Sequence, residues 1–364
     1  MEYILHIIII YVYRLTEREK LVLYFLVKWP NLNDIELSRR IPVKRPTITA
    51  IRNKLRRDGL FYNVVVPNIP ALGCELLVLR YGAFNPAFPY DARKKYSATA
   101  KFPEVFFKQS CDSQQVSLSA HSNFTDAMRY VEYSSINYNK HDLLTPDGLR
   151  HVFLPLAISK VLRFFEFAPL LKQEFEIRAH DGKYEEKQVQ DNVVPRALTG
   201  NEKLVLYALV KYPEDNDGEI ARKVSMTRQS VNKLRKKLEE DRLIARIRIP
   251  DMKRFGYEVM VMAHFFNNPK HPLEERKEGL KYTLAIGNIV FMVVSNLESV
   301  IVGYQKSFTS YKREMNHFME YYKKSDFVGK EPEIVIIPVE EIKESMNGRY
   351  HPLVKKMLGI EQEI

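Results

Sequence analysis

A basic stretch at residues 227–238 carries side chains that are suited to binding a nucleic acid. It reads Thr-Arg-Gln-Ser-Val-Asn-Lys-Leu-Arg-Lys-Lys-Leu. In a DNA major groove, Arg pairs with guanine and Asn or Gln with adenine, and both Lys and Arg bind phosphates. The residues expected to contact bases are Arg228, Gln229, Asn232 and Lys233. The residues expected to contact phosphates, with Thr227 at the start of the same surface, are Arg235, Lys236, Arg246 and Arg248.

A helix must present these side chains together, and the spacing of apolar residues predicts one. Val231, Leu234 and Leu238 fall at i, i+3 and i+7, which places them on one face of a helix. Thr227 is a suitable N-cap for it. Residues 217–224 form a second expected helix, and Ser225-Met226 forms the turn between the two. The pattern predicts a helix-turn-helix whose second helix lies in a DNA groove.

A second helix of the same design is expected at residues 44–55. Its apolar face is Ile48, Ile51 and Leu55. The DNA-contacting residues expected here are Lys44, Arg45, Thr47, Thr49, Arg52 and Lys54. Pro46 stands where the other helix has Gln229, so this helix offers fewer bidentate partners for bases. Two non-identical reading helices predict an asymmetric binding site on double-stranded DNA.

The two helices belong to an internal duplication with an offset of 183 residues. Between residues 15 and 86, about 28 of 72 positions are identical to the residue 183 places later. Matches at the same offset continue to Pro169-Leu170 and Pro352-Leu353. A period this long indicates two copies of a whole domain pair rather than a solenoid. Apolar segments such as 259–262 and 289–294 would be an association hazard if exposed, so we expect the second halves of the two copies to pack on each other as an internal pseudo-dimer, with the number of assembling chains left open.

Charge and composition fit this interpretation. Of the formal net charge of +11, residues 15–67 carry +6 and residues 198–250 carry +4, so the excess lies in the two helix-turn-helix segments. Concentrated positive charge of this kind is expected for phosphate binding. The two cysteines, Cys74 and Cys111, suit a reducing compartment, and we expect a cytoplasmic protein. The apolar run at the N-terminus is too short to span a bilayer, so no membrane association is expected.

The second half of each copy alternates strands and helices in the order βαββαβ, which is the ferredoxin-like motif. The predicted fold class is α+β, with a helix-turn-helix domain and a ferredoxin-like domain repeated in tandem. Short strands at residues 61–66 and 244–249 follow the basic helices as a small wing or a connecting strand. The expected divisions are an apolar extension (1–14), helix-turn-helix one (15–70), ferredoxin-like domain one (71–174), a polar linker (175–197), helix-turn-helix two (198–253) and ferredoxin-like domain two (254–358).

The order of elements resembles the Lrp/AsnC (feast/famine) family of transcription regulators. Specific matches are Asp217-x-Glu219-Ile220-Ala221, Met226-Thr227-Arg228-Gln229-Ser230-Val231 and Leu238-Glu239-Glu240-x-x-Leu243-Ile244. The resemblance implies a sequence-specific DNA-binding regulator. Family members carry a Gly-Asp-rich turn between the second and third strands that takes part in binding amino-acid effectors. The corresponding turns here, 295–299 and 111–114, contain no glycine, so no effector site is carried over.

Two alternatives remain open. The duplicated architecture is also similar to that of sirohaem decarboxylases, which would need Arg and His side chains in the α/β domains to hold tetrapyrrole carboxylates. The residues available for that role are His264, His271, Arg276, His121 and Arg93. The other alternative is a helix-turn-helix that contacts only protein. The nine histidines form no metal-binding pattern, and no phosphate loop or nucleophile motif occurs. We therefore expect no enzyme activity, catalytic residue, metal or cofactor, and leave a small-molecule effector open.

Overall fold

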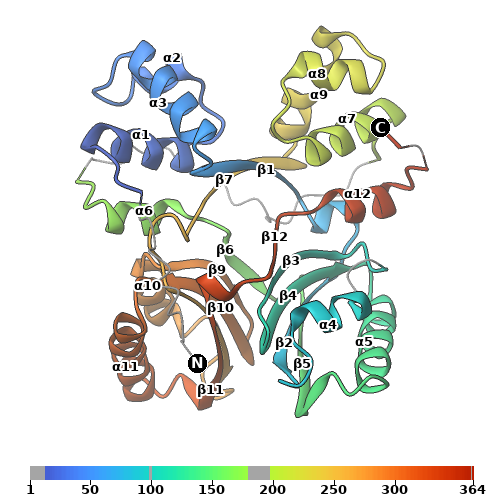
Figure 1. The fold of residues 1–364 in the computed structure, drawn as a ribbon, viewed down its shortest axis with the longest axis vertical. Helices are drawn as coiled ribbons and strands as arrows, with labels where there is room; N and C mark the ends of the chain where they lie inside the picture. The colour runs from blue at the N-terminus through green and yellow to red at the C-terminus, as the bar shows by residue number, and fades with distance from the viewer. Residues whose placement is uncertain (1–12, 98–100, 179–196, 362) are drawn as a thin grey trace, which may run out of the picture.

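The computed structural model describes residues 13–97, 101–178, 197–361 and 363–364. Two helix-turn-helix units lie side by side at one end of the molecule (Figure 1). Their helices are α1 (Glu17–Lys28), α2 (Asp34–Ser38), α3 (Arg45–Arg57), α7 (Gly200–Lys211), α8 (Asp217–Lys223) and α9 (Arg228–Glu240). Capping boxes at Thr16–Glu19 and Thr199–Glu202 fix where the first helix of each unit begins. Both basic helices form over the residues that the apolar spacing predicts.

A two-stranded ribbon joins the two units. Strand β1 (Phe61–Pro67) pairs antiparallel with β7 (Ile244–Pro250), and Val64 faces Ile247 in the middle. Each strand thus pairs with the other copy and not within a hairpin of its own. The sequence left open whether these strands form a small wing or a connecting strand. The structure shows that they are connecting strands.

Two five-stranded sheets form the other end of the molecule, with strand orders β12-β3-β4-β2-β5 and β11-β8-β10-β9-β6. The first contains β2 (Leu76–Phe84), β3 (Val105–Ser110), β4 (Gln114–His121), β5 (Leu144–Pro155) and β12 (Glu344–Asn347). The second contains β6 (Lys160–Phe164), β8 (Val259–Asn267), β9 (Ile289–Val294), β10 (Glu298–Gln305) and β11 (Val328–Pro338). Short 3-10 turns lie at η1 (Pro70–Leu72), η2 (Lys94–Tyr96) and η4 (Val339–Glu341).

The copies exchange strands. The edge strand β6 of the first copy pairs with β9 of the second, and β12 of the second copy pairs with β3 of the first. The helices that follow, α6 (Ala168–Glu174) and α12 (His351–Leu358), pack toward the helix-turn-helix end (Figure 1). The two copies therefore form one continuous body. The sequence pattern predicts only a short closing tail at residues 169–175 and 352–358, where α6 and α12 form, and it predicts neither β6 nor β12.

The sheets face each other, and their outer faces carry helices. Leu77 and Leu79 of β2 share a core cluster with Met260 and Met262 of β8, which places these residues between the sheets. Helix α5 (Phe124–Asn139) covers the outer face of the first sheet, and α10 (Lys277–Ala285) and α11 (Phe308–Lys324) cover that of the second (Figure 1). Because alternate residues of a strand point to opposite faces, Val78 and Arg80 point toward α5.

One expected helix differs between the copies. A helix is expected over residues 91–101 of the first copy, but the described residues there form only α4 (Tyr90–Arg93) and the turn η2. The second copy has the regular helix α10 at the equivalent place. The expectations for residues 1–12 and for 179–196 lie outside the described residues. None of the helices in the described part of the chain is long and apolar enough to cross a membrane.

Candidate anion-binding site

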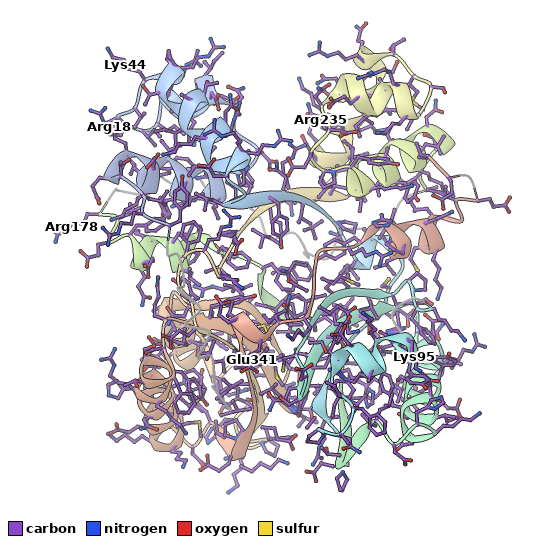
Figure 2. All side chains as sticks on the ribbon, viewed as in Figure 1. Arg18, Lys44, Lys95, Arg178, Arg235 and Glu341 are labelled. Carbon is purple, nitrogen blue, oxygen red and sulfur yellow. The ribbon has the colours of Figure 1, made fainter. Side chains whose placement is uncertain are left out.

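The residues predicted to contact DNA form two groups. Members of the exposed group are open to solvent, and members of the engaged group bind acidic side chains of the protein itself. Seven of them are exposed on α3 and α9 or just before these helices: Lys44, Arg45, Thr227, Arg228, Gln229, Lys233 and Lys236. Lys44 lies at the tip of the first unit, and Arg235 lies on the side of the second unit that faces the first (Figure 2). Thr47 is half-buried. The exposed group is therefore concentrated toward the N-terminal ends of the two helices.

The engaged group is tied to acidic residues in the same way in both copies. Asp34 binds Thr49 Oγ1 at 2.6 Å and Arg52 Nη1 at 2.8 Å. Asp217 binds Asn232 Nδ2 at 2.6 Å and Arg235 Nε at 2.8 Å. An ion pair of 2.6 Å likewise joins Lys54 to Glu19. These contacts hold the basic helices on their own domains and reduce what the side chains offer to a ligand.

Arg248, expected at a phosphate, lies inside the protein. It is 7% exposed, and its guanidinium donates to the carbonyl oxygens of Leu26 at 2.5 Å and Pro30 at 3.1 Å. Burial lowers its pKa to about 10. Arg246 is half-buried, and burial lowers its pKa as well. Arg248 thus satisfies one carbonyl in the last turn of α1 of the other copy and one just beyond that helix, so it has a structural role.

A different set of polar side chains gathers on the outer face of the first sheet. Strand pairing places Lys108, Ser117, Arg80 and His151 in one row across β3, β4, β2 and β5, here called the polar row. The second sheet has Met292, Ile301, Ala263 and Ile334 in the same order across β9, β10, β8 and β11, here called the apolar row. The duplication therefore provides an internal comparison of one site with and without its charges.

The apolar row belongs to one continuous core cluster beneath α10 and α11. In the first copy, the apolar contacts beneath α5 are divided among three small clusters. The space between a sheet and its helices is normally an apolar core. Polar side chains interrupt that core in one copy only, so the fold does not require them.

Arg80 is the central residue of the polar row. It is 0% exposed, and none of its three guanidinium nitrogens has a hydrogen-bond partner among the described residues. The guanidinium lies over the rings of Tyr130 and Tyr138, at 4.7 and 5.7 Å from their centres. Arginine keeps its charge at neutral pH, and a buried charge without a counter-ion is costly. A buried, unpaired cation of this kind is suited to receiving an anion.

Two further groups of the row face the same space. Lys108, 2% exposed, has its Nζ 2.9 Å from Ser97 Oγ and 2.5 Å from Glu344 Oε2 of the exchanged strand. Burial lowers the pKa of Lys108. Burial and then the charge of Arg80 lower the pKa of His151 to about 4, so this imidazole is neutral at pH 7. Its Nε2 is buried without a hydrogen-bond partner among the described residues.

The residues that the sequence offered for tetrapyrrole carboxylates do not gather in one place. Arg93 Nη2 donates to Cys111 O, and its duplicate Arg276 Nη2 donates to Ser295 O at 2.7 Å, so both brace the turn after a strand. His264 Nδ1 meets Tyr81 Oη at 2.9 Å between the sheets. His271 lies at the surface beside Glu275 and Asp326. Of this set, His121 and Arg93 lie on the outer side of the first sheet, and the Arg93 guanidinium packs on Phe84 with its Cζ 3.8 Å from the ring centre.

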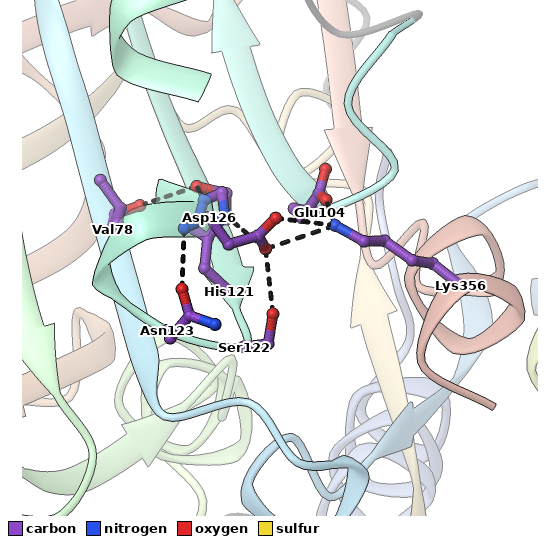
Figure 3. Close-up of polar contacts among 8 residues, drawn as sticks. Val78, Glu104, His121, Ser122, Asn123, Asp126 and Lys356 are labelled. Carbon is purple, nitrogen blue, oxygen red and sulfur yellow. Dashed lines mark hydrogen bonds and ion pairs between the residues drawn. The ribbon is translucent and has the colours of Figure 1, made fainter. Parts of the chain in front are cut away.

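His121 belongs to an ion-pair network at the end of that face (Figure 3). Its Nδ1 lies 3.5 Å from Asp126 Oδ2, and burial lowers its pKa to about 4. Glu104, His121 and Asp126 offer ligand atoms within 4.8 Å of one another, a spacing that could suit a metal ion. Lys356 of α12 pairs with Glu104 and lies 3.0 Å from Asp126 Oδ1. Its ammonium supplies the positive charge there and ties the second copy to the first.

Sequence reasoning missed Arg80, Lys108 and His151 because it used the positions at which the copies agree. The sequence signal that could have found them was a difference between the two copies at equivalent positions. Arg80 interrupts the apolar run Leu-Leu-Val-Leu, and the residue 183 places later is Ala263. A charged residue in a strand that is apolar in the duplicate indicates a site that one copy has and the other lacks.

No protein-family model matches the chain, and no curated protein matches it in sequence. Among solved structures, the sirohaem decarboxylase NirDL matches 94% of this chain and 99% of its own, with 12% identity and a TM-score of 0.52. NirDL in complex with an iron-uroporphyrin III analogue gives the same identity and TM-score over 95% and 100%. This likeness establishes a shared fold over the whole chain, that of two helix-turn-helix and ferredoxin-like units.

Regulators match only in part. AsnC of E. coli covers 39% of this chain and 93% of its own, with 14% identity and a TM-score of 0.32. LrpC of B. subtilis covers 39% and 95%, with 16% identity and a TM-score of 0.32. Such partial matches do not establish DNA binding. The sequence-based expectation that the chain is not an enzyme is contradicted by the match over nearly the whole chain, which is with an enzyme, the sirohaem decarboxylase NirDL.

Proposed function

We propose that the chain is a decarboxylase of a carboxylate-bearing tetrapyrrole and that the polar row of the first sheet is its substrate site. The observation that carries this proposal is Arg80, which is fully buried and has no partner among the described residues for any guanidinium nitrogen. The full-length structural neighbours are sirohaem decarboxylases, whose substrate is an anion of this class. The duplicate copy has Ala263 at this position, which indicates a specialised rather than a structural arginine.

The spacing of the cations suits a ligand with more than one carboxylate. Arg80 and Lys108 stand on β2 and β3, on either side of Ser117 on β4. Two strand spacings place their backbones about 10 Å apart. One carboxylate would bind the guanidinium in a bidentate manner, and a second would replace Glu344 as the partner of Lys108. Tetrapyrrole side chains carry carboxylates at separated positions around the ring, so a single ligand can satisfy both cations.

The proposed reaction breaks the bond between a carboxylate carbon and the side-chain carbon that bears it. Carbon dioxide leaves, the electron pair stays on the side-chain carbon, and that carbon takes up one proton to become a methyl group. His151 adjoins Arg80 in the strand register and is the group we assign as proton donor. Its imidazole is neutral in the empty site, and a bound anion beside it would raise its pKa toward the working pH.

The direct test is turnover of sirohaem under anaerobic conditions, with the loss of carbon dioxide followed by mass spectrometry. The wild-type chain is expected to give a decarboxylated product. R80A should lower the rate at least about a hundredfold, because a charge-assisted bidentate contact inside a buried site is lost. R129A is the matched control, since Arg129 is exposed on the outer side of α5. Turnover by R80A at the wild-type rate would contradict the proposal.

Duplex DNA binding is a second candidate function, favoured by a separate observation. Lys44, Arg45, Arg228, Lys233 and Lys236 are exposed at the two helix-turn-helix units. No ion pair within the described residues engages them. The β1–β7 ribbon joins the two units. The exposed basic side chains on the two helices could therefore contact two grooves of one DNA duplex. Five further predicted contacts are held within the protein by Asp34, Asp217 and Glu19, namely Thr49, Arg52, Asn232, Arg235 and Lys54.

A salt titration with mixed-sequence duplex DNA tests this second function. Affinity should fall steeply with salt, and K236A should flatten the slope by about one phosphate contact. R248V should leave the slope unchanged, because Arg248 donates to backbone carbonyls inside the protein. R129A serves as a distant control for the loss of one positive charge. An affinity that does not respond to salt would exclude groove binding by these helices.

A further inference from the structure

A cavity lies in the second copy at the place where the first copy has its polar row. It has a volume of about 70 Å³ and lies between the second sheet and α11. Its walls are mostly apolar and include Ala263 and Ile301 of the apolar row together with Phe265, Ile289 and Phe318. Glu314 and Met315 of α11 are only half-buried, so the cavity reaches the surface along that helix.

A single carboxylate stands in this apolar lining. Glu314 accepts hydrogen bonds from Asn288 Nδ2 at 2.9 and 3.1 Å and from Gln305 Nε2 at 2.7 Å. Both amides are 9% exposed and also line the cavity. No Lys, Arg or His of the described residues lies within ion-pair distance of Glu314. The amides fix the carboxylate in place but leave its negative charge unbalanced.

The backbone keeps this space open. Gly303 of β10 lines the cavity where the strand register shifts, and a Cβ at this position would lie 2.7 Å from the carbonyl oxygen of Asn288. A larger residue would push that segment, and with it the Asn288 amide, away from Glu314. The glycine therefore allows Asn288 both to approach β10 and to hold the carboxylate.

We propose that this cavity is a binding site for a small alkyl amine. The ammonium group binds Glu314, and the alkyl group lies against Ile289, Ile301 and Phe318. Each water-sized group needs roughly 10–15 Å³ of cavity volume, so a cavity of about 70 Å³ has room for about five non-hydrogen atoms of a ligand. The charge preference is opposite to that of the first copy, where buried cations face the site. This inference does not depend on the proposed decarboxylase activity.

The test uses isobutylamine, with isobutanol as the neutral analogue of similar shape and isobutyrate as the anionic one. The full-length chain is labelled on Ile and Met methyl groups, and each ligand is titrated at neutral pH by NMR. The amine should shift the Ile289, Ile301 and Met315 methyl signals with an affinity at least about tenfold higher than that of either analogue, because a charged hydrogen bond is added.

E314Q keeps the shape of the side chain and should remove this preference for the amine. E320Q is the matched control, since Glu320 lies on the same helix and is exposed to solvent. A263L should fill the cavity and abolish binding of the amine and of the alcohol. The proposal is overturned if the amine leaves the three methyl signals unchanged, if it binds no better than isobutanol, or if E314Q keeps the amine preference. None of these outcomes bears on sirohaem turnover, so the two proposals fail separately.

Discussion

Two histidines of the first copy, His121 and His151, are held neutral by their surroundings. Burial is the largest cause of the lowered pKa in both, and each falls to about 4. The sign follows from linkage. Below the ordinary histidine value of about 6.5, the unfolded chain takes up protons that the folded chain does not, so the folded state loses stability as the pH falls toward 4.

His121, which is fully buried, gives the clearest prediction. Lowering the pH from 7 to 5 should reduce the free energy of unfolding by about 1–2 kcal/mol through His121, because this residue is protonated in the unfolded chain and not in the folded one. H121Q should remove this part of the pH dependence, and the second copy shows that the fold accepts Gln305 at the corresponding end of β10. Urea unfolding at the two pH values measures the difference. H317Q, on the exposed side of α11, is the control and should leave the pH dependence as in the wild type.

A wild-type chain that is equally stable at pH 7 and pH 5 would contradict this account of His121. So would an H121Q variant that loses as much stability between those values as the wild type. Because His151 contributes in the same direction, H121Q is expected to retain part of the dependence. The remaining slope in H121Q includes the contributions of His151 and of His351, whose pKa burial also lowers.

At the scale of elements, local patterns predicted most helices and the strands that pair within one copy. Capping boxes and apolar spacing are properties of neighbouring residues, and α1, α7, α3 and α9 follow them. Strands β1 and β7 were predicted as well, although they pair between the copies. The strands β6 and β12 were not predicted, because they are short edge strands of five and four residues that are added to the sheet of the other copy. Arg248 is a single residue for which the local sequence pattern likewise could not show a contact with the other copy. Its alternation with Ile247 and Ile249 indicated an exposed basic face, but the carbonyls that it satisfies belong to α1 of the other copy.

The short α4 is the element that most affects the site. In the second copy, α10 covers the apolar row as part of a continuous core. In the first copy, the turn η2 and Ser97 stand near Lys108 instead, and Ser97 Oγ accepts from Lys108 Nζ. A helix packed directly on the row would exclude a ligand. The order of elements in the second copy predicted a helix at the equivalent place in the first, where the sequence pattern is less clear.

At the scale of the whole molecule, the duplication and its fold could be predicted from identical positions, whereas the site on the first sheet was missed because its signal lies at positions where the copies differ. Both copies keep the residues that position the helix-turn-helix units, such as Asp34 and Asp217. They diverge on the outer faces of the sheets, where one carries Arg80 and the other Ala263. The outer faces of the two sheets therefore present sites of different chemistry related by an internal pseudo-symmetry, a polar row with buried cations in the first copy and an apolar cavity with one carboxylate in the second. The central claim is that only the first of these binds a polyanionic tetrapyrrole.

The most direct test of that claim is an absorption titration of the full-length chain with iron-uroporphyrin III. The account predicts one equivalent bound per chain. It also predicts no binding at the same concentrations by the triple variant R80A/K108M/H151I, in which each residue of the polar row except Ser117 becomes its counterpart in the apolar row. The second copy shows that this fold packs with those residues. Circular dichroism is the check that the variant is folded. Binding of the tetrapyrrole by the folded triple variant with the wild-type affinity, or two equivalents bound by the wild-type chain, would contradict the account.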